Sequence, residues 1–188
     1  MPDDIANAVN EGVGILNHNT AGGRVRFRTN SAYVAIKAVM PFISVMPHMT
    51  LTRSTGFDLY IDQNGKSTYC KTFMPSLDIK DGYESVINFS DNQERDLTIN
   101  FPLYSDVSNL FIGLQQDAII TTGDDYRYPH PIVYYGSSIT QGGCASRPVT
   151  CYTAIIFRHL NCDHINLGFA GNAKGEDRMT DYIAGLTM

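Results

Sequence analysis

The pattern of the chain changes near Tyr126–Pro131, and this change constrains the fold more than any other feature. Between about residues 22 and 122, apolar and polar residues alternate and turn residues separate the runs, as is typical of antiparallel strands. After the change, short apolar strands alternate with helical segments and glycine-rich turns. This second pattern predicts a parallel sheet whose ligands bind beyond the carboxyl ends of its strands. We therefore expect two domains, residues 1–125 and 130–188.

Two segments of the first half carry their own turn signals. Residues 22–40 alternate on both sides of Thr29–Asn30–Ser31, which predicts a hairpin. Within residues 57–73, Asn64–Gly65 separates two strand-like runs and supplies the positive φ values that tight hairpin turns need. Later runs within residues 96–123 predict two or three more strands. The first half is predicted to be an antiparallel β-sandwich of jelly-roll or similar type.

Composition excludes several classes of partner. The net charge is -5, and no block of lysine or arginine supplies the positive patch that nucleic acid or anionic membranes require. The amino terminus is acidic where a signal peptide is basic, and no apolar run approaches the ~18 residues of a membrane span. We therefore expect a cytoplasmic chain. The four cysteines form no CxxC pair, so free thiols are expected in preference to disulfides or a zinc site.

The stretch GSSITQGG, residues 136–143, follows an apolar strand and raises the question of a nucleophilic serine. A serine at a strand-to-helix turn can stand clear of the sheet, with the first amides of the next segment pointing at any oxyanion beside it. In the alternative interpretation, Ser137 or Ser138 only caps backbone amides. The string is not GxSxG, which disfavours the nucleophile elbow of α/β-hydrolases.

A second glycine-rich turn, residues 166–176, follows the next predicted strand. Its glycines would let the backbone approach a ligand closely, as in sites that bind phosphate groups. The spacing satisfies neither the Walker pattern nor GxGxxG, which makes a nucleotide site the weaker interpretation.

Three strings together carry a family resemblance: GFDLY at residues 56–60, VYYGSSITQGGCASRP at 133–148 and INLGFAGNAKGE at 165–176. In this order they resemble the GDSL-like SGNH hydrolases, specifically a bacterial subgroup with an amino-terminal GxDLY β-domain. The resemblance implies a jelly-roll-like β-sandwich followed by the first part of an α/β flavodoxin-like SGNH hydrolase domain.

The resemblance also assigns roles to residues. Ser138 corresponds to the nucleophile of the G-D-S-L signature, with Ser137 in the place of the Asp. Gly171 corresponds to the glycine whose amide helps to form the oxyanion hole, and the Ser138 amide is the companion donor. The family's oxyanion-hole Asn and its Asp-x-x-His have no match in these residues, and the chain ends where the Asn block is expected.

The serine still needs a base, and the chain has five histidines. His130, His159 and His164 are predicted at the amino edge of the sheet, roughly 15 Å from the serine turn, because each strand residue advances ~3.3 Å. They are interpreted as boundary and surface residues. His18 and His48 lie in loop-like segments of the β-half that can overhang the site. His48 is the preferred candidate for a pocket wall, with an ordinary loop histidine as the alternative.

Two further charged residues lie in or beside the motifs. Arg147 follows the serine turn and is a candidate substrate-binding residue at the pocket mouth. Asp58, in GFDLY, alternates with apolar neighbours and is expected on the solvent face or tied into a turn. Aromatic residues of the strands can form a platform for sugars, but core packing is the default.

These observations predict an SGNH-type serine esterase or acylhydrolase that needs no metal or organic cofactor. The expected substrate is a small-molecule or carbohydrate ester, with carbohydrate acetyl esters chosen by family analogy alone. The alternative is a non-catalytic, glycan-binding module, or an inactive fragment that lacks the histidine base. An unpaired sheet edge and uncovered apolar surface would make the chain a homo-oligomer or prone to aggregation.

Overall fold

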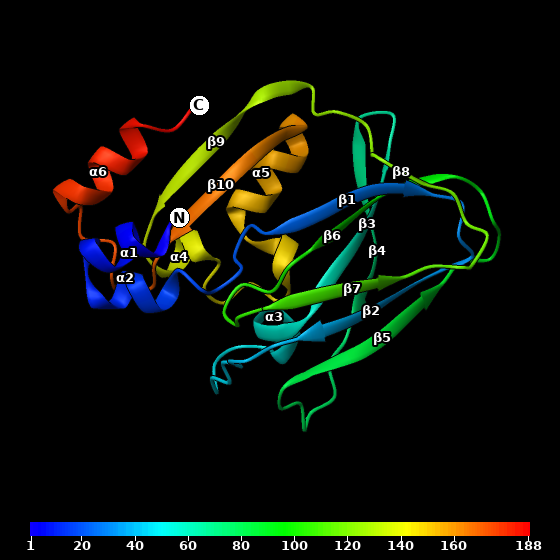
Figure 1. Cartoon of the computed structure of the whole chain (residues 1–188), viewed down its shortest axis with the longest axis horizontal. Helices are drawn as coiled ribbons and strands as arrows, with labels where there is room; N and C mark the ends of the chain where they lie inside the picture. The colour runs from blue at the N-terminus through cyan, green and yellow to red at the C-terminus, as the bar shows by residue number, and fades with distance from the viewer.

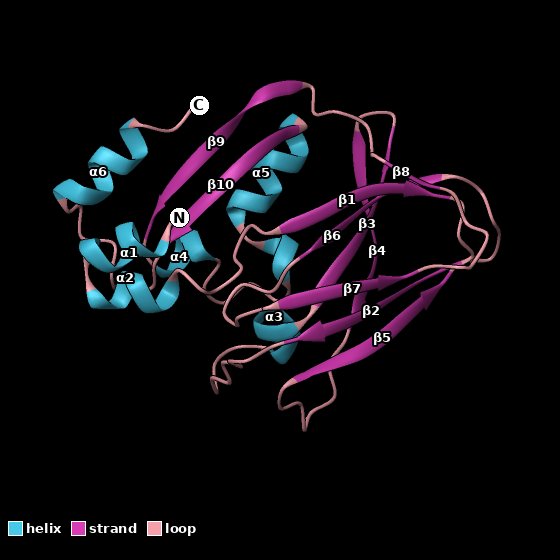
Figure 2. Ribbon diagram, in the orientation of Figure 1, coloured by secondary structure: helices cyan, strands magenta, loops and turns pink.

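Two antiparallel sheets packed face to face form the larger part of the computed structural model, which describes residues 1–188 (Figures 1 and 2). The larger sheet has, in spatial order, β4 (Lys66–Phe73), β3 (Phe57–Gln63), β6 (Arg95–Asn100), β1 (Arg24–Thr29) and β8 (Ile120–Thr121). The smaller sheet contains β5 (Gly82–Asn88), β2 (Tyr33–Val39) and β7 (Asn109–Gly113), and the short helix α3 (Leu51–Thr55) precedes β3. The predicted β-sandwich is therefore present.

The expected hairpin over residues 22–40 is wrong. β1 pairs with β6 and β8, whereas β2 pairs with β5 and β7, so the two strands lie in opposite sheets. Buried Phe27 on β1 and Val34 and Ile36 on β2 belong to one core cluster between the sheets. Alternation shows which face of a strand is apolar, but it does not show whether two strands pair or pack face to face.

The Asn64–Gly65 hairpin is confirmed. Gln63 on β3 pairs with Lys66 on β4, so the loop has two residues. Their φ values are 54° and 72°, the left-handed values that such turns require.

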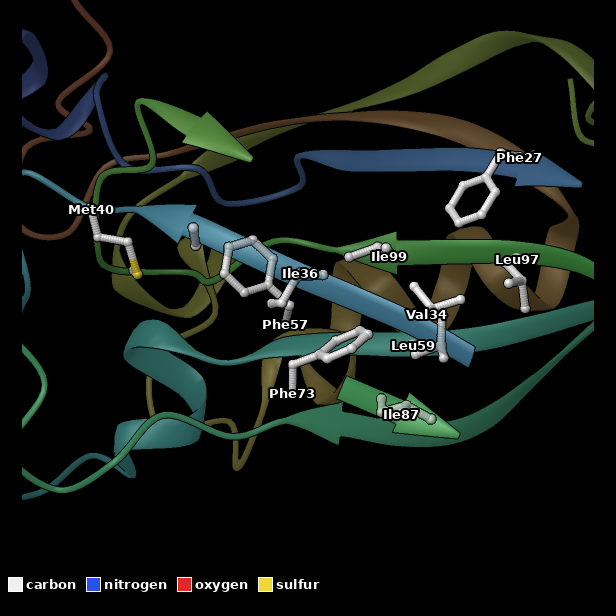
Figure 3. Packing of buried hydrophobic residues seen from close by; sticks show 11 residues of the cluster. Phe27, Val34, Ile36, Met40, Phe57, Leu59, Phe73, Ile87, Leu97 and Ile99 are labelled. Carbon is white, nitrogen blue, oxygen red and sulfur yellow. The ribbon is translucent and has the colours of Figure 1, made fainter. Parts of the chain in front are cut away.

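The sandwich is held together by eleven buried apolar residues from both sheets (Figure 3). Phe57, Phe73 and Ile36 lie close together in this core, and none is more than 2% exposed. Full burial of each such side chain contributes about 1.5–3 kcal/mol relative to an exposed position. This core stabilises the sandwich, from which the residues described below reach the second unit.

The second unit is an α/β layer built on β9 (Tyr128–Gly136) and β10 (Cys162–Gly168), which pair in parallel. It also contains α4 (Ser138–Gln141), the 3-10 turn η1 (Pro148–Thr150), α5 (Tyr152–Leu160) and α6 (Asp177–Ala184). The predicted strand and helix order is therefore present. No helix of the structure is long and apolar enough to cross a bilayer.

Two short helices at the amino terminus were not predicted. α1 (Asp3–Val9) and α2 (Glu11–Leu16) contribute Ala6 and Val13 to a core cluster with Leu167, Phe169 and Met179 of the α/β layer. They have seven and six residues, too few for a clear helical period. The division at residues 125–130 remains a prediction, and residues 1–16 pack on the carboxyl-terminal side of it.

Candidate active site

The serine turn lies beyond the carboxyl end of β9. Gly136 and Gly168 are the last residues of β9 and β10 and are partners in the parallel register. Ser138 opens α4, which lies directly beyond both strand ends (Figure 1). A Cβ on Gly168 would lie 2.1 Å from the Gln141 nitrogen, so only glycine lets α4 approach β10 this closely.

The second glycine-rich turn contacts the first. Gly171 has a φ of +72°, and its N–H donates to Ser137 Oγ at 2.8 Å. The structure therefore brings Ser137, Ser138 and Gly171 together, as parallel strand ends at one sheet edge require. Ser137, in the position of the signature's Asp, is one of the residues that join the two turns.

Two residues for which the sequence indicated no role support the serine turn. Tyr104, from the β-domain, donates its hydroxyl to the Ser138 carbonyl oxygen at 3.2 Å. Gln141 is fully buried; its Nε2 donates to the Leu103 carbonyl at 3.1 Å, and its Oε1 accepts from the Ala170 N–H at 2.9 Å. A lone tyrosine after a strand and a glutamine in a turn carry no sequence signal for these contacts.

Tyr104 is itself held by a buried cation. The Arg53 guanidinium lies 4.3 Å from the centre of the Tyr104 ring, and its three nitrogens have no hydrogen-bond acceptor. A desolvated cation–π contact is worth about 2 kcal/mol. The stack therefore fixes the ring whose hydroxyl contacts the Ser138 carbonyl.

The histidines of the α/β layer lie far from the serine turn. His164 pairs with Ile132, four residues before Gly168, which corresponds to about 13 Å along the strand. His130, within β9, and His159, near the end of α5, are exposed, as the sequence predicted.

His164 is not a surface residue, and that part of the prediction is wrong. It is 5% exposed and stacks on the Phe157 ring at 4.3 Å. Burial, with a further contribution from Arg24, lowers the pKa of this imidazole to about 3. The side chain is therefore a neutral core residue at physiological pH.

Neither loop histidine is positioned as a base. His48 lies exposed between β2 and α3, and His18 lies exposed after α2 at the edge of a cleft. No hydrogen bond joins Ser138 Oγ to any histidine of the chain. Ser138 is half-buried and lacks an activating partner among these residues.

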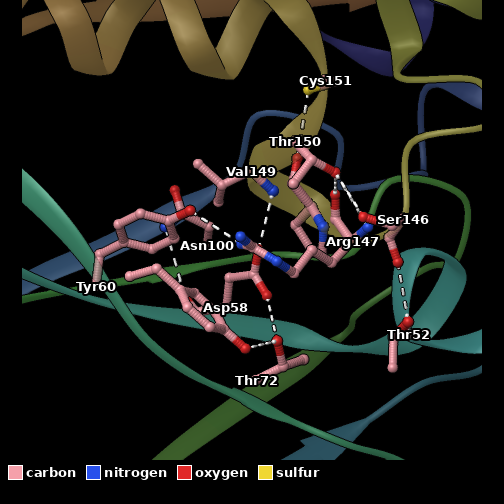
Figure 4. A network of polar contacts seen from close by, with 12 residues as sticks. Thr52, Asp58, Tyr60, Thr72, Asn100, Ser146, Arg147, Val149, Thr150 and Cys151 are labelled. Atoms are coloured by element: carbon pink, nitrogen blue, oxygen red, sulfur yellow. Dashed lines mark hydrogen bonds and ion pairs between the residues drawn. The ribbon is translucent and has the colours of Figure 1, made fainter.

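Asp58, in the GxDLY motif, is fully buried, so the expectation of a solvent-facing or turn carboxylate is wrong (Figure 4). Its Oδ2 accepts from Arg147 Nη1 at 2.9 Å and from the Val149 N–H at 3.0 Å, and its Oδ1 accepts from Thr72 Oγ1 at 2.7 Å. A β-domain carboxylate thus binds the segment that follows the serine turn.

Arg147 does not contact Ser138, and its candidate role at the pocket mouth gains no support. Besides its ion pair with Asp58, its Nη1 donates to the Tyr60 hydroxyl at 2.9 Å, and its guanidinium lies 3.9 Å from the centre of the Tyr69 ring. Its side chain is 25% exposed. The geometry makes Arg147 part of the contact between the two units.

The structure offers no cluster of three or more histidine, cysteine or acidic side chains suited to a metal ion, and its four cysteines are unpaired. What it offers is a serine turn, a glycine amide and a β-sandwich that supports both. This combination defines the class of protein: a β-sandwich joined to an α/β layer of the SGNH hydrolase type.

The chain belongs to the SGNH-hydrolase-type esterases with a GxDLY amino terminus, whose family model matches residues 1–120. A model of the GDSL-like lipase/acylhydrolase family matches residues 129–187. No curated protein matches the chain.

Solved structures show the same fold. A protein described as a GDSL-like lipase from Bacteroides ovatus is 32% identical, with a TM-score of 0.88 over 96% of this chain and 53% of that one. The salicylyl-acyltransferase SsfX3 of a tetracycline biosynthetic pathway is 22% identical, with a TM-score of 0.73 over 99% of this chain and 51% of that one. A family two carbohydrate esterase from Clostridium thermocellum is 13% identical, with a TM-score of 0.58 over 90% of this chain and 55% of that one. The chain spans about half the length of these proteins.

Proposed function

We propose that this chain supplies the nucleophile and part of the oxyanion hole of a serine ester hydrolase. Ser138 Oγ attacks the ester carbonyl carbon, and the N–H groups of Ser138 and Gly171 receive the negative oxygen that forms. The Ser138 proton passes to a base, which the residues around Ser138 do not supply, and from it to the departing alkoxide. Collapse of the intermediate breaks the ester C–O bond, releases the alcohol and leaves an acyl group on Ser138, which water then removes as the carboxylic acid.

The observation that carries the proposal is the contact between Gly171 N–H and Ser137 Oγ at 2.8 Å. It shows that the Gly171 amide reaches an oxygen on the serine turn at the distance an oxyanion requires. In the proposed reaction, the substrate oxygen replaces the Ser137 hydroxyl as the acceptor of this hydrogen bond.

Covalent labelling with a fluorophosphonate, followed by peptide mapping, tests the proposal. We expect the label on Ser138, abolished in Ser138→Ala and retained in Ser90→Ala, a control at an exposed serine between β5 and β6. This result requires that a base reach Ser138 from a loop histidine or from another copy of the chain. Label on Ser137, or none on protein shown to be folded, would contradict an activated Ser138 in this chain. The second result would mean that the chain carries the serine without its base, which is the inactive-fragment alternative, because Ser138 has no base within hydrogen-bond reach.

Carbohydrate acetyl esters remain the substrate class suggested by the family resemblance. No residue of the candidate site selects a sugar, so the choice rests on analogy. Acetate release from acetylated monosaccharides, compared between the chain and its Ser138→Ala variant, tests it directly; equal release from both would reject these substrates.

A further inference from the structure

A large cleft lies beside the serine turn, between α2 and the loop that joins β2 to α3. Its volume is about 620 Å³, within the range of about 300–1,000 Å³ that is usual for small-molecule sites. Its apolar lining consists of Ile15, Leu16, Phe42, Met46, Tyr104 and Ala170. Gln141 Nε2 of α4 donates to Asn19 Oδ1, which follows α2 and also lines the cleft, at 3.0 Å.

Two apolar side chains of the cleft lining are exposed to solvent. Ile15 is 63% exposed and Phe42 is 52% exposed. A ligand that covered both would remove their apolar surface from water, which favours binding. The cleft therefore favours a ligand with an apolar body.

Two residues of the cleft lining adjoin the proposed site. Tyr104, part of its lining, donates to the Ser138 carbonyl oxygen at 3.2 Å. Ala170, also in the lining, immediately precedes Gly171, whose N–H lies on the serine turn. A substrate with its carbonyl at Ser138 and Gly171 thus has this cleft as a neighbour.

The charges of the cleft select against anions. Its ionisable lining residues are Glu11, Asp106 and His18, with no lysine or arginine among them. The Asp106 carboxylate accepts from Asn19 Nδ2 at 2.8 Å. A negatively charged group would meet two carboxylates and no fixed cation, which raises the cost of its desolvation.

We propose that this cleft binds a neutral, apolar group of the ester substrate, next to the scissile carbonyl. This inference rests on the proposed function and gives it a substrate class: esters with a bulky hydrocarbon group, aromatic or aliphatic, and no negative charge. Family analogy favours carbohydrate acetyl esters, whereas the lining of this cleft favours a different group.

The first test measures binding without chemistry, using the neutral fluorescent probe N-phenyl-1-naphthylamine and the 188-residue chain. We expect saturable binding, and a Kd raised at least tenfold by Phe42→Asp. Phe111→Asp is the matched control, because Phe111 is 57% exposed on β7 and lines a separate apolar hollow. A change of less than twofold is expected there. Absent binding, or equal weakening by both variants, would overturn the proposal.

The second test links the cleft to Ser138 without needing a base. In Ser138→Cys, the thiol adds to a maleimide, and peptide mapping distinguishes it from the exposed Cys144. For each thiol we compare the rate of reaction with N-cyclohexylmaleimide to the rate with N-methylmaleimide. We expect this rate ratio to be at least fivefold higher for the Ser138→Cys thiol than for free glutathione. Adding Phe42→Asp should bring the ratio back to the glutathione value. A ratio equal to that of glutathione would overturn the proposal.

The two proposals fail in different ways. If fluorophosphonate does not label the chain but both cleft tests are positive, the proposal of an activated Ser138 is rejected and the proposal of an apolar site beside residue 138 stands. Labelling of Ser138 with both binding tests negative would reject the apolar site and leave the ester hydrolase.

Discussion

Removing the Asp58 carboxylate is expected to weaken the contact between the β-sandwich and the segment after the serine turn. Asp58 is fully buried, and its partner Arg147 is 25% exposed. In Asp58→Ala, the Arg147 guanidinium and the buried Val149 N–H both lose their acceptor. Breaking a buried ion pair in this way costs about 3–5 kcal/mol, a large share of a typical total of about 5–15 kcal/mol.

The Asp58→Asn variant removes the negative charge but keeps a side chain that can form hydrogen bonds. The amide oxygen can take the place of Oδ2 and accept from Arg147 and Val149, while Thr72 can rotate its hydroxyl to accept from the new NH2. Hydrogen bonds to a charged group are roughly twice as strong as neutral ones. We therefore expect a loss of about 1–2 kcal/mol, well below that of the alanine variant.

The assay is urea unfolding of wild type, Asp58→Asn and Asp58→Ala, combined with amide hydrogen exchange over residues 144–151. A loss of 3–5 kcal/mol corresponds to a fall in Tm of roughly 6–20 °C for a chain of this size. Exchange should accelerate in residues 144–151 before it does in the sandwich core. A loss below 1 kcal/mol in Asp58→Ala, with unchanged exchange there, would refute the role assigned to this carboxylate.

Three further perturbations test other parts of the structure. Gly168→Ala would place its Cβ 2.1 Å from the backbone nitrogen of Gln141, so lower stability and loss of fluorophosphonate labelling are expected; Gly185→Ala, with only ordinary contacts, should change neither. The pKa of His164 is about 3 in the folded state and about 6.5 in the unfolded state. Between these pH values the unfolded chain binds a proton that the folded chain does not. The free energy of unfolding should therefore fall by about 1.4 kcal/mol for each unit that the pH drops from 6.5 toward 3. Urea unfolding of His164→Leu should lose this slope, and an unchanged slope would contradict the assignment. The exposed apolar side chains of α5, which include Ile155 at 50%, predict self-association in sedimentation velocity that Ile155→Lys reduces; a monomeric wild type would contradict it.

Features set by local chemistry could be predicted from the sequence. Asn64–Gly65 determines its own hairpin, because two left-handed residues in succession suit few other structures. The proximity of the serine turn and Gly171 also followed, since parallel strands bring their carboxyl ends to one edge. The pairing of β1 with β6 did not, because the choice between strand partners depends on residues about 70 positions away in the chain.

The burial of Asp58 could not be predicted from the alternation of apolar and polar residues in β3. Because its neighbours Phe57 and Leu59 face the sandwich core, the period of two correctly directs Asp58 to the opposite face of β3. That face is covered by η1, which brings the Val149 N–H to the carboxylate. The sequence of a strand does not show whether a second layer covers its outer face. For the same reason the burial of His164 could not be predicted from its strand.

The serine turn depends on the sandwich for its position. Its carbonyl at Ser138 is bound by Tyr104, and its buried Gln141 donates to the Leu103 carbonyl, both from the segment after β6. The chain that follows the turn is held by Asp58 on β3. These three contacts join one turn to two parts of the β-domain. The proposed reaction at Ser138 requires donors fixed to a fraction of an ångström. On that proposal the β-domain forms part of the site, and loosening the Asp58 contact should reduce labelling of Ser138 before it unfolds the chain.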